Sequence, residues 1–100
     1  MTRPSPEDGV PMLSDRQTEA LRESAEPIAV GGESDWEVAV HVYALQTRLA
    51  YAGGSVPAGL FVRTVSGKSE YAYPVSDAAA AIAYADETER RYVAWAEANP

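Results

Sequence analysis

The chain lacks cysteine entirely, and His41 is the only histidine among its 100 residues. Disulfide bonds, thiolate catalysis and cysteine-based metal sites are therefore excluded. A histidine that binds a metal or moves a proton needs partner groups, and no second histidine is present to provide them. We interpret His41 as a partly buried or solvent-facing hydrogen-bonding residue, and we predict no catalytic residue, no metal site and no cofactor.

Long apolar segments are also missing. No apolar run approaches the roughly 18–20 residues that span a bilayer, and residues 1–12 lack the apolar region of a signal peptide. With the absence of cysteine, this favours a cytoplasmic location without membrane contact. The two Gly-Gly pairs, at residues 31–32 and 53–54, lack the lysine and the spacing of a phosphate-binding loop. We interpret both pairs as turns.

Basic residues are scarce, with 8 Lys and Arg against 15 Asp and Glu and a net charge of −7. Residues 1–37 contain nine acidic and three basic residues, whereas residues 38–75 contain one acidic and three basic residues. Affinity for a phosphate backbone comes from Lys and Arg. Direct binding of nucleic acid is therefore not expected.

Two runs of strand-forming residues, at 60–65 and 71–75, predict a β-hairpin around a turn at residues 66–68. The two-residue loop is either 67–68 in a type II′ turn or 66–67 in a type I′ turn. Both registers give the same two faces. The face predicted to enter the core carries Leu60, Val62, Thr64, Tyr71, Tyr73 and Val75. Because Pro74 cannot donate to a ladder, the second strand should lie at a sheet edge or end there.

Residues 76–99 predict a long C-terminal helix, with Ser76 or Asp77 as its N-cap and an alanine run behind it. One helical stripe should pack on the hairpin, with Glu89 as its single charged member. The apolar members of this stripe are Ala78, Ala81, Ile82, Ala85, Tyr92 and Ala96.

The N-terminal part predicts a tail and a short helix. Residues 1–11 are rich in Pro, Ser, Glu and Gly and should be disordered. Residues 12–100 should form one domain. Ser14 and Gln17 form a capping-box pattern for a polar helix over 14–26, which Pro27 ends and which should attach weakly to the core. Residues 28–30 form a possible short third strand.

Residues 35–52 predict a second helix. Ser34 and Glu37 form another capping-box pattern, and the length of the segment favours a helix. Apolar residues also alternate over 36–42, which leaves a strand as the alternative for the first half. As a helix, the segment would be apolar on two sides, which is typical of a central element or of one that contacts a second chain.

The predicted fold class is therefore α+β, with two N-terminal helices, a β-hairpin and a long C-terminal helix packed on the hairpin. Six tyrosines and two tryptophans accompany a single phenylalanine. Tyr71, Tyr73 and Tyr92 should fill the seam between hairpin and helix. Rings outside the main apolar stripes suit an interface, because Tyr and Trp combine apolar area with a polar tip. The predicted partner-binding residues are Trp36, Val40, Tyr43, Tyr84 and Trp95.

These features predict a small, acidic, non-enzymatic protein-binding module, such as an inhibitor, an immunity or antitoxin-type protein, or a phage-encoded modulator of a host protein. One alternative is a nucleic-acid mimic that presents carboxylates to a basic DNA- or RNA-binding protein. A small enzyme that works through carboxylates and tyrosines is a further alternative. The two apolar sides of the predicted 35–52 helix also predict a homodimer.

Overall fold

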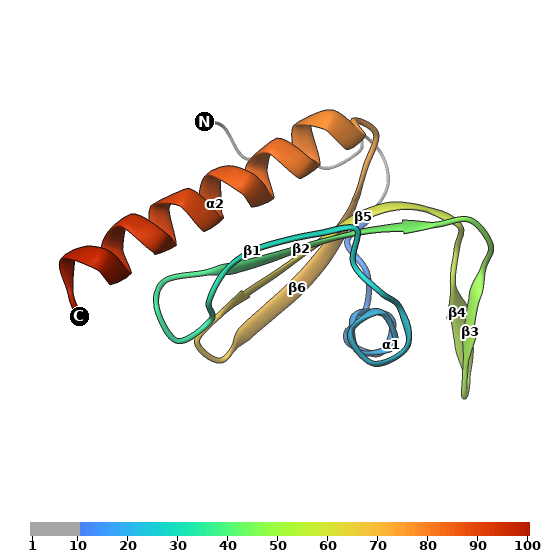
Figure 1. Cartoon of the computed structure of the whole chain (residues 1–100). Coiled ribbons are helices and arrows are strands. Elements are labelled where there is room, and N and C mark those ends of the chain that lie inside the picture. The colour runs from blue at the N-terminus through green and yellow to red at the C-terminus, as the bar shows by residue number, and fades with distance from the viewer. Residues whose placement is uncertain (1–10) are drawn as a thin grey trace.

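A computed structural model describes residues 11–100, which fold around an antiparallel sheet with one helix on each face (Figure 1). The sheet has the order β1 (Ala29–Gly32), β2 (Ala39–Leu45), β5 (Gly59–Ser66), β6 (Ser69–Val75). The remaining elements are helix α1 (Asp15–Ser24), the small hairpin β3 (Leu49–Tyr51) and β4 (Gly54–Val56), and helix α2 (Ala78–Ala98). The α+β class is as predicted. The predicted tail lies outside the described residues, apart from Pro11.

The predicted hairpin forms strands β5 and β6. Ser66 pairs with Ser69, so that the loop is Gly67-Lys68, the first of the two predicted registers. Gly67 has φ of 60°, a value that glycine adopts without strain. Strand β6 lies at the edge of the sheet, as Pro74 requires. Residues 29–32 provide a further strand at the opposite edge, which confirms the possible third strand.

The predicted helix over residues 35–52 is wrong, and the strand alternative describes its first half. Residues 39–45 form β2, which pairs with β1 on one side and with β5 on the other. Val40 and Val42 point to one face of the sheet, whereas Tyr43 points to the other, and all three are buried. Strand β2 buries apolar residues on both faces, and this is the origin of the two apolar sides. The second glycine pair, Gly53-Gly54, lies at the turn of the β3–β4 hairpin, so its interpretation as a turn is confirmed.

Each face of the sheet carries its own apolar cluster. The cluster under α2 contains Val40, Val42, Val62, Tyr73, Val75, Ala81 and Ala85. The cluster under α1 contains Ala20, Leu21, Tyr43, Val56, Phe61 and Ala72. The hairpin face that carries Phe61 and Ala72 is therefore also part of the core. The prediction that only one face of the hairpin enters the core is incomplete. Leu21 is fully buried, so the predicted weak attachment of the first helix is wrong.

Helix α1 begins as its sequence predicts. The Ser14 side chain accepts a hydrogen bond from the Gln17 backbone N–H, and the Gln17 side chain accepts one from the Ser14 N–H at 2.9 Å. The Gln17 amide also donates to the Ser55 carbonyl at 3.1 Å, which ties α1 to β4. Helix α2 begins at the N-cap Asp77, whose carboxylate accepts from the Ala80 N–H at 3.0 Å.

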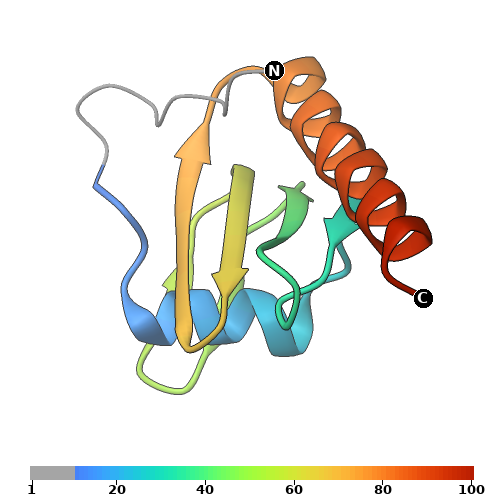
Figure 2. The ribbon, with the colours of Figure 1, turned by 90° about the vertical axis from the view of Figure 1, so that its left-hand side faces the viewer.

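Helix α2 lies mainly over β1 and β2, and not mainly over the β5–β6 hairpin as predicted (Figure 2). Its backbone approaches β1 at Gly31, where a Cβ atom would lie 1.9 Å from the Ala85 carbonyl oxygen. The Gly32 N–H donates to Glu89 Oε1 at 3.0 Å, which explains a carboxylate on the packed side of the helix. The first glycine pair is thus a contact surface for a helix and not a turn. Neither helix in residues 11–100 has the length and apolarity that a membrane crossing requires.

We predict that Gly31→Ala strongly destabilises the fold, because the new methyl group meets backbone atoms of α2. The expected loss in free energy of unfolding is at or above the upper end of the roughly 1–3 kcal/mol typical of overpacking. Gly67→Ala is the matched control, since a Cβ there meets nothing within 4 Å. Its cost should be only the roughly 1–2 kcal/mol of a left-handed backbone. Urea unfolding of both variants measures the ranking, and a larger loss for Gly67→Ala would contradict the packing at Gly31.

Candidate functional site

Three aromatic side chains meet where the C-terminal half of α2 passes the loop between β1 and β2. Trp36 comes from this loop, and Tyr92 and Trp95 come from α2 one turn apart. The ring centroids of Trp36 lie 5.4 Å from Tyr92 and 6.2 Å from Trp95, and those of Tyr92 and Trp95 are 6.3 Å apart. These separations are typical of interacting aromatic rings. We call these three residues the aromatic cluster.

The aromatic cluster is anchored on one side and open on the other. The Arg91 guanidinium lies 5.7 Å from the Trp36 ring centroid and forms an ion pair with Glu37 at 3.2 Å. Trp95 keeps 46% of its surface exposed. Figure 1 shows the C-terminal end of α2 extending past the β1–β2 loop. The cluster is therefore a fixed aromatic surface at the end of the molecule.

The structure brings together only two of the five predicted partner-binding residues, Trp36 and Trp95. Val40 is fully buried under α2 and Tyr43 is 1% exposed under α1, so neither can contact a partner, and both predictions need correction. Their assignment depended on the incorrect helix. Tyr84 is half-buried and packs against the core cluster under α2.

Tyr92 is the functional candidate that the sequence analysis missed. It was assigned to the seam with Tyr71 and Tyr73, whose rings stack on each other 6.0 Å apart. Tyr92 instead packs on Trp36 and Trp95. The i, i+3 spacing of Tyr92 and Trp95 places both rings on neighbouring positions of one helix surface. This spacing is the sequence signal that could have identified the pair.

A buried arginine organises the opposite face of the sheet. Arg63 is 6% exposed, and its Nε donates to the Tyr43 hydroxyl at 3.0 Å. Its Nη1 donates to Glu70 at 2.5 Å, and the same carboxylate accepts from Arg22 of α1 at 2.7 Å. Arg63 faces Ala72 across the ladder, so the contact with Glu70 is diagonal. The network connects α1, β2, β5 and β6.

His41 lies beside Arg63 as its direct neighbour on the adjacent strand. Burial lowers the pKa of His41 below its usual value, the positive charge of Arg63 lowers it further, and Glu70 acts in the opposite direction. The interpretation of His41 as a partly buried residue agrees with its intermediate exposure. No group of three or more His, Asp or Glu side chains in residues 11–100 is arranged to hold a metal ion.

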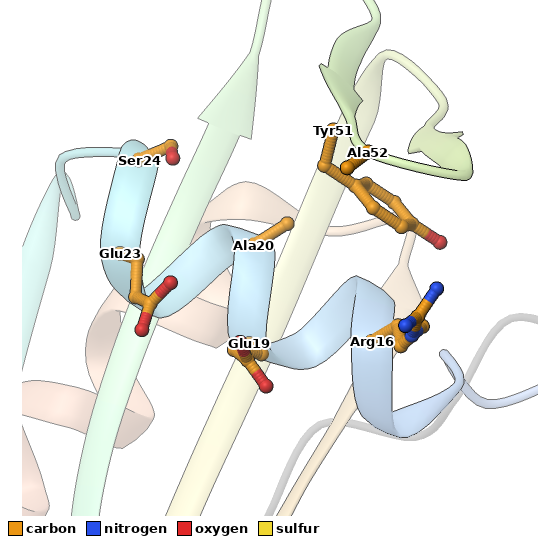
Figure 3. A pocket seen from close by; sticks show the side chains of 7 residues that line it. All are labelled: Arg16, Glu19, Ala20, Glu23, Ser24, Tyr51 and Ala52. Carbon is orange, nitrogen blue, oxygen red and sulfur yellow. The ribbon is translucent and has the colours of Figure 1, made fainter.

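A wide recess separates α1 from the β3–β4 hairpin and has a volume of about 340 Å³. Glu19 and Glu23 line it from α1, with Arg16 at one end, and Tyr51 approaches from the hairpin (Figure 3). A Cβ atom at Gly54 would lie 2.8 Å from the Tyr51 hydroxyl, so this glycine makes room for the ring. The recess combines charges of both signs. Its lining residues do not point to a particular reaction or ligand.

We predict that Arg63→Ala destabilises the protein more than Arg22→Ala, although both side chains bind Glu70. Arg63 is the buried partner, and its loss leaves the Tyr43 hydroxyl and part of Glu70 without a donor. The expected cost is roughly 1.5–3 kcal/mol for a hydrogen bond to a charged group. The Arg22 side chain is 44% exposed, and its loss should cost below about 1 kcal/mol. Equal urea midpoints for the two variants would contradict this difference.

We predict that His41 reduces stability in mild acid. Its folded pKa is below its unfolded value of about 6.5, so the unfolded chain binds a proton first as the pH falls. The contribution to the free energy of unfolding is therefore complete above that pH and is lost as the pH falls through the folded pKa. His41→Gln should lose less stability than the unaltered protein between about pH 7.5 and pH 5. Parallel pH profiles of the two proteins would exclude this role.

Comparison of the chain with known protein families, with curated proteins and with solved structures reveals no match.

Proposed function

We propose that this protein is a non-enzymatic protein-binding module, and that the aromatic cluster is its contact surface. The observation that supports this most directly is the exposed Trp95, which is held in place by Tyr92 and Trp36. Tryptophan and tyrosine are enriched among the residues that dominate binding energy. Rings that are already ordered lose little side-chain freedom on binding. An inhibitor, an immunity or antitoxin-type protein, or a phage-encoded modulator fits this description.

The surroundings of the aromatic cluster indicate what kind of partner approaches. Asp35 is exposed in the β1–β2 loop, directly before Trp36 in the chain. Arg91 is the nearest base, and its charge is paired with Glu37. With Arg91 neutralised by Glu37, the charge of Asp35, which forms no ion pair within residues 11–100, lies beside the aromatic centre, favours a partner with a positive surface patch and accelerates the encounter. The aromatic contact would then determine how long the complex lasts.

The nucleic-acid mimic has less support than the aromatic surface. Mimicry needs a row of carboxylates that is free to meet basic side chains. In residues 11–100, Glu37, Glu70 and Glu87 are instead each paired with an arginine of the same chain. The enzyme alternative has no specific observation in its favour. The homodimer prediction was based on a helix over residues 35–52, which does not form. If the protein does self-associate, the aromatic cluster is the surface that it would use.

We predict that Trp95→Ala abolishes capture of the partner, whereas Val93→Ala does not. Both residues are exposed apolar side chains of α2, at 46% and 40%. They lie roughly 200° apart around the helix, so only Trp95 belongs to the aromatic cluster. Unaltered protein and both variants, each checked for folding by circular dichroism, would be immobilised and exposed to lysate of the native host. A protein retained by the unaltered chain and by Val93→Ala, but not by Trp95→Ala, is the expected result.

The same partner, once purified, distinguishes the two modes of binding. For the aromatic surface, raising the salt from about 0.05 to 0.5 M should reduce mainly the association rate. For mimicry, the affinity itself should collapse. Equal retention by all three proteins would contradict the assignment of the aromatic cluster. Sedimentation of the protein alone would show whether the captured partner is a second copy.

A further inference from the structure

The sheet face that carries α1 is not completely covered. Helix α1 packs near Tyr43, Phe61 and Ala72, whereas the part of this face next to β1 is open. A recess of about 270 Å³ lies there, between the β1–β2 loop and strands β1, β2 and β5. It is distinct from the aromatic cluster, which lies on the side of α2.

The walls of this recess combine apolar and donor groups. Val30, Ala39 and Val65 contribute apolar surface, and His41 and Arg63 contribute hydrogen-bond donors. Val30 is 48% exposed and marks the open side of the recess. Exposed Glu33 also lines the recess, from the loop.

Arg63 is positioned before any ligand arrives. Its Nε and Nη1 are held by Tyr43 and Glu70, so the plane of the guanidinium is fixed. Its Nη2 makes no hydrogen bond to any residue between 11 and 100, although Arg63 as a whole is only 6% exposed. This part of the guanidinium therefore remains available to an acceptor that enters the recess. Fixed geometry of this kind lowers the cost of binding one.

We propose that this recess binds a carboxylate group carried on a short aliphatic body. The carboxylate would accept from Arg63 Nη2 and from His41, and the aliphatic part would contact Val30 and Val65. A single negative charge is favoured, because Glu33 lines the same recess and Glu70 already occupies the other edge of Arg63. Dicarboxylates should be disfavoured by these two carboxylates.

His41 provides a direct probe, since the only imidazole signal in a proton NMR spectrum of the full chain belongs to it. The groups that act on it from neighbouring elements are Arg63, Glu70 and Glu33. A bound anion favours the charged imidazole. Saturating sodium butyrate at constant ionic strength should therefore raise the midpoint of the His41 titration, whereas butyramide, its uncharged analogue, should not. Succinate should bind at least about five-fold more weakly than butyrate.

Two substitutions in the recess, Val30→Phe and Glu33→Gln, and one control outside it test whether butyrate binds there. Val30→Phe fills the open side of the recess and should weaken butyrate binding at least about ten-fold. Ile28→Phe is the matched control, because Ile28 is a similarly exposed residue, at 51%, that does not line the recess. Glu33→Gln should strengthen butyrate binding and reduce the discrimination against succinate. Both Phe variants change exposed positions, and their amide spectra verify the fold.

A comparison of butyrate with N-acetylvaline identifies the source of the carboxylate. Tighter binding of butyrate indicates a free short-chain acid, and tighter binding of N-acetylvaline indicates the carboxyl terminus of a peptide; each supports the proposed chemistry. Equal responses to butyrate and butyramide overturn it. The absence of a saturable response to butyrate below roughly 50 mM, a dissociation constant that corresponds to less than about 2 kcal/mol of binding free energy, also overturns it. So does a response that Val30→Phe and Ile28→Phe change equally.

Discussion

The close approach of α2 to β1 at Gly31 determines how the rest of the molecule is arranged. The Ala85 carbonyl occupies the space in which any other residue at position 31 would place its Cβ atom. The helix therefore lies over β1 and β2, and its C-terminal half passes the β1–β2 loop. Tyr92 and Trp95 reach Trp36 only because of this position. The contact at Gly31 and the aromatic cluster therefore both result from the same packing of α2 on β1.

The same geometry explains why the sheet is covered unequally. On one face, α2 covers the β1 side, and its small residues Ala81 and Ala85 allow close packing. On the other face, α1 is only ten residues long and covers the β6 side together with β4. The part of that face near Val30 stays open beside Arg63 and His41. The two candidate surfaces therefore lie on opposite faces, with the β1–β2 loop contributing to both.

Local signals in the sequence were sufficient for about half of the elements. The hairpin loop at Gly67-Lys68, the capping box at Ser14 and the N-cap Asp77 each depend on residues within a few positions of one another. The helix prediction for residues 35–52 was wrong because their structure depends on contacts with distant parts of the chain. Apolar residues alternate over 36–42, but the central strand is covered on both faces, so Ala39 and Tyr43 are apolar as well and the alternation does not continue. The capping-box pattern at Ser34 then favoured a helix, although these residues form a turn.

The sequence by itself determined the α+β class, the edge position of β6, the long C-terminal helix and the presence of exposed aromatic rings. Only the tertiary structure decided which rings meet, because Trp36 and Trp95 are 59 positions apart and their contact depends on the close packing at Gly31. It also decided that Val40 and Tyr43 are core residues and that Arg63 is a buried cation. Burial is a property of what covers a residue, and that covering comes from parts of the chain that are distant in sequence.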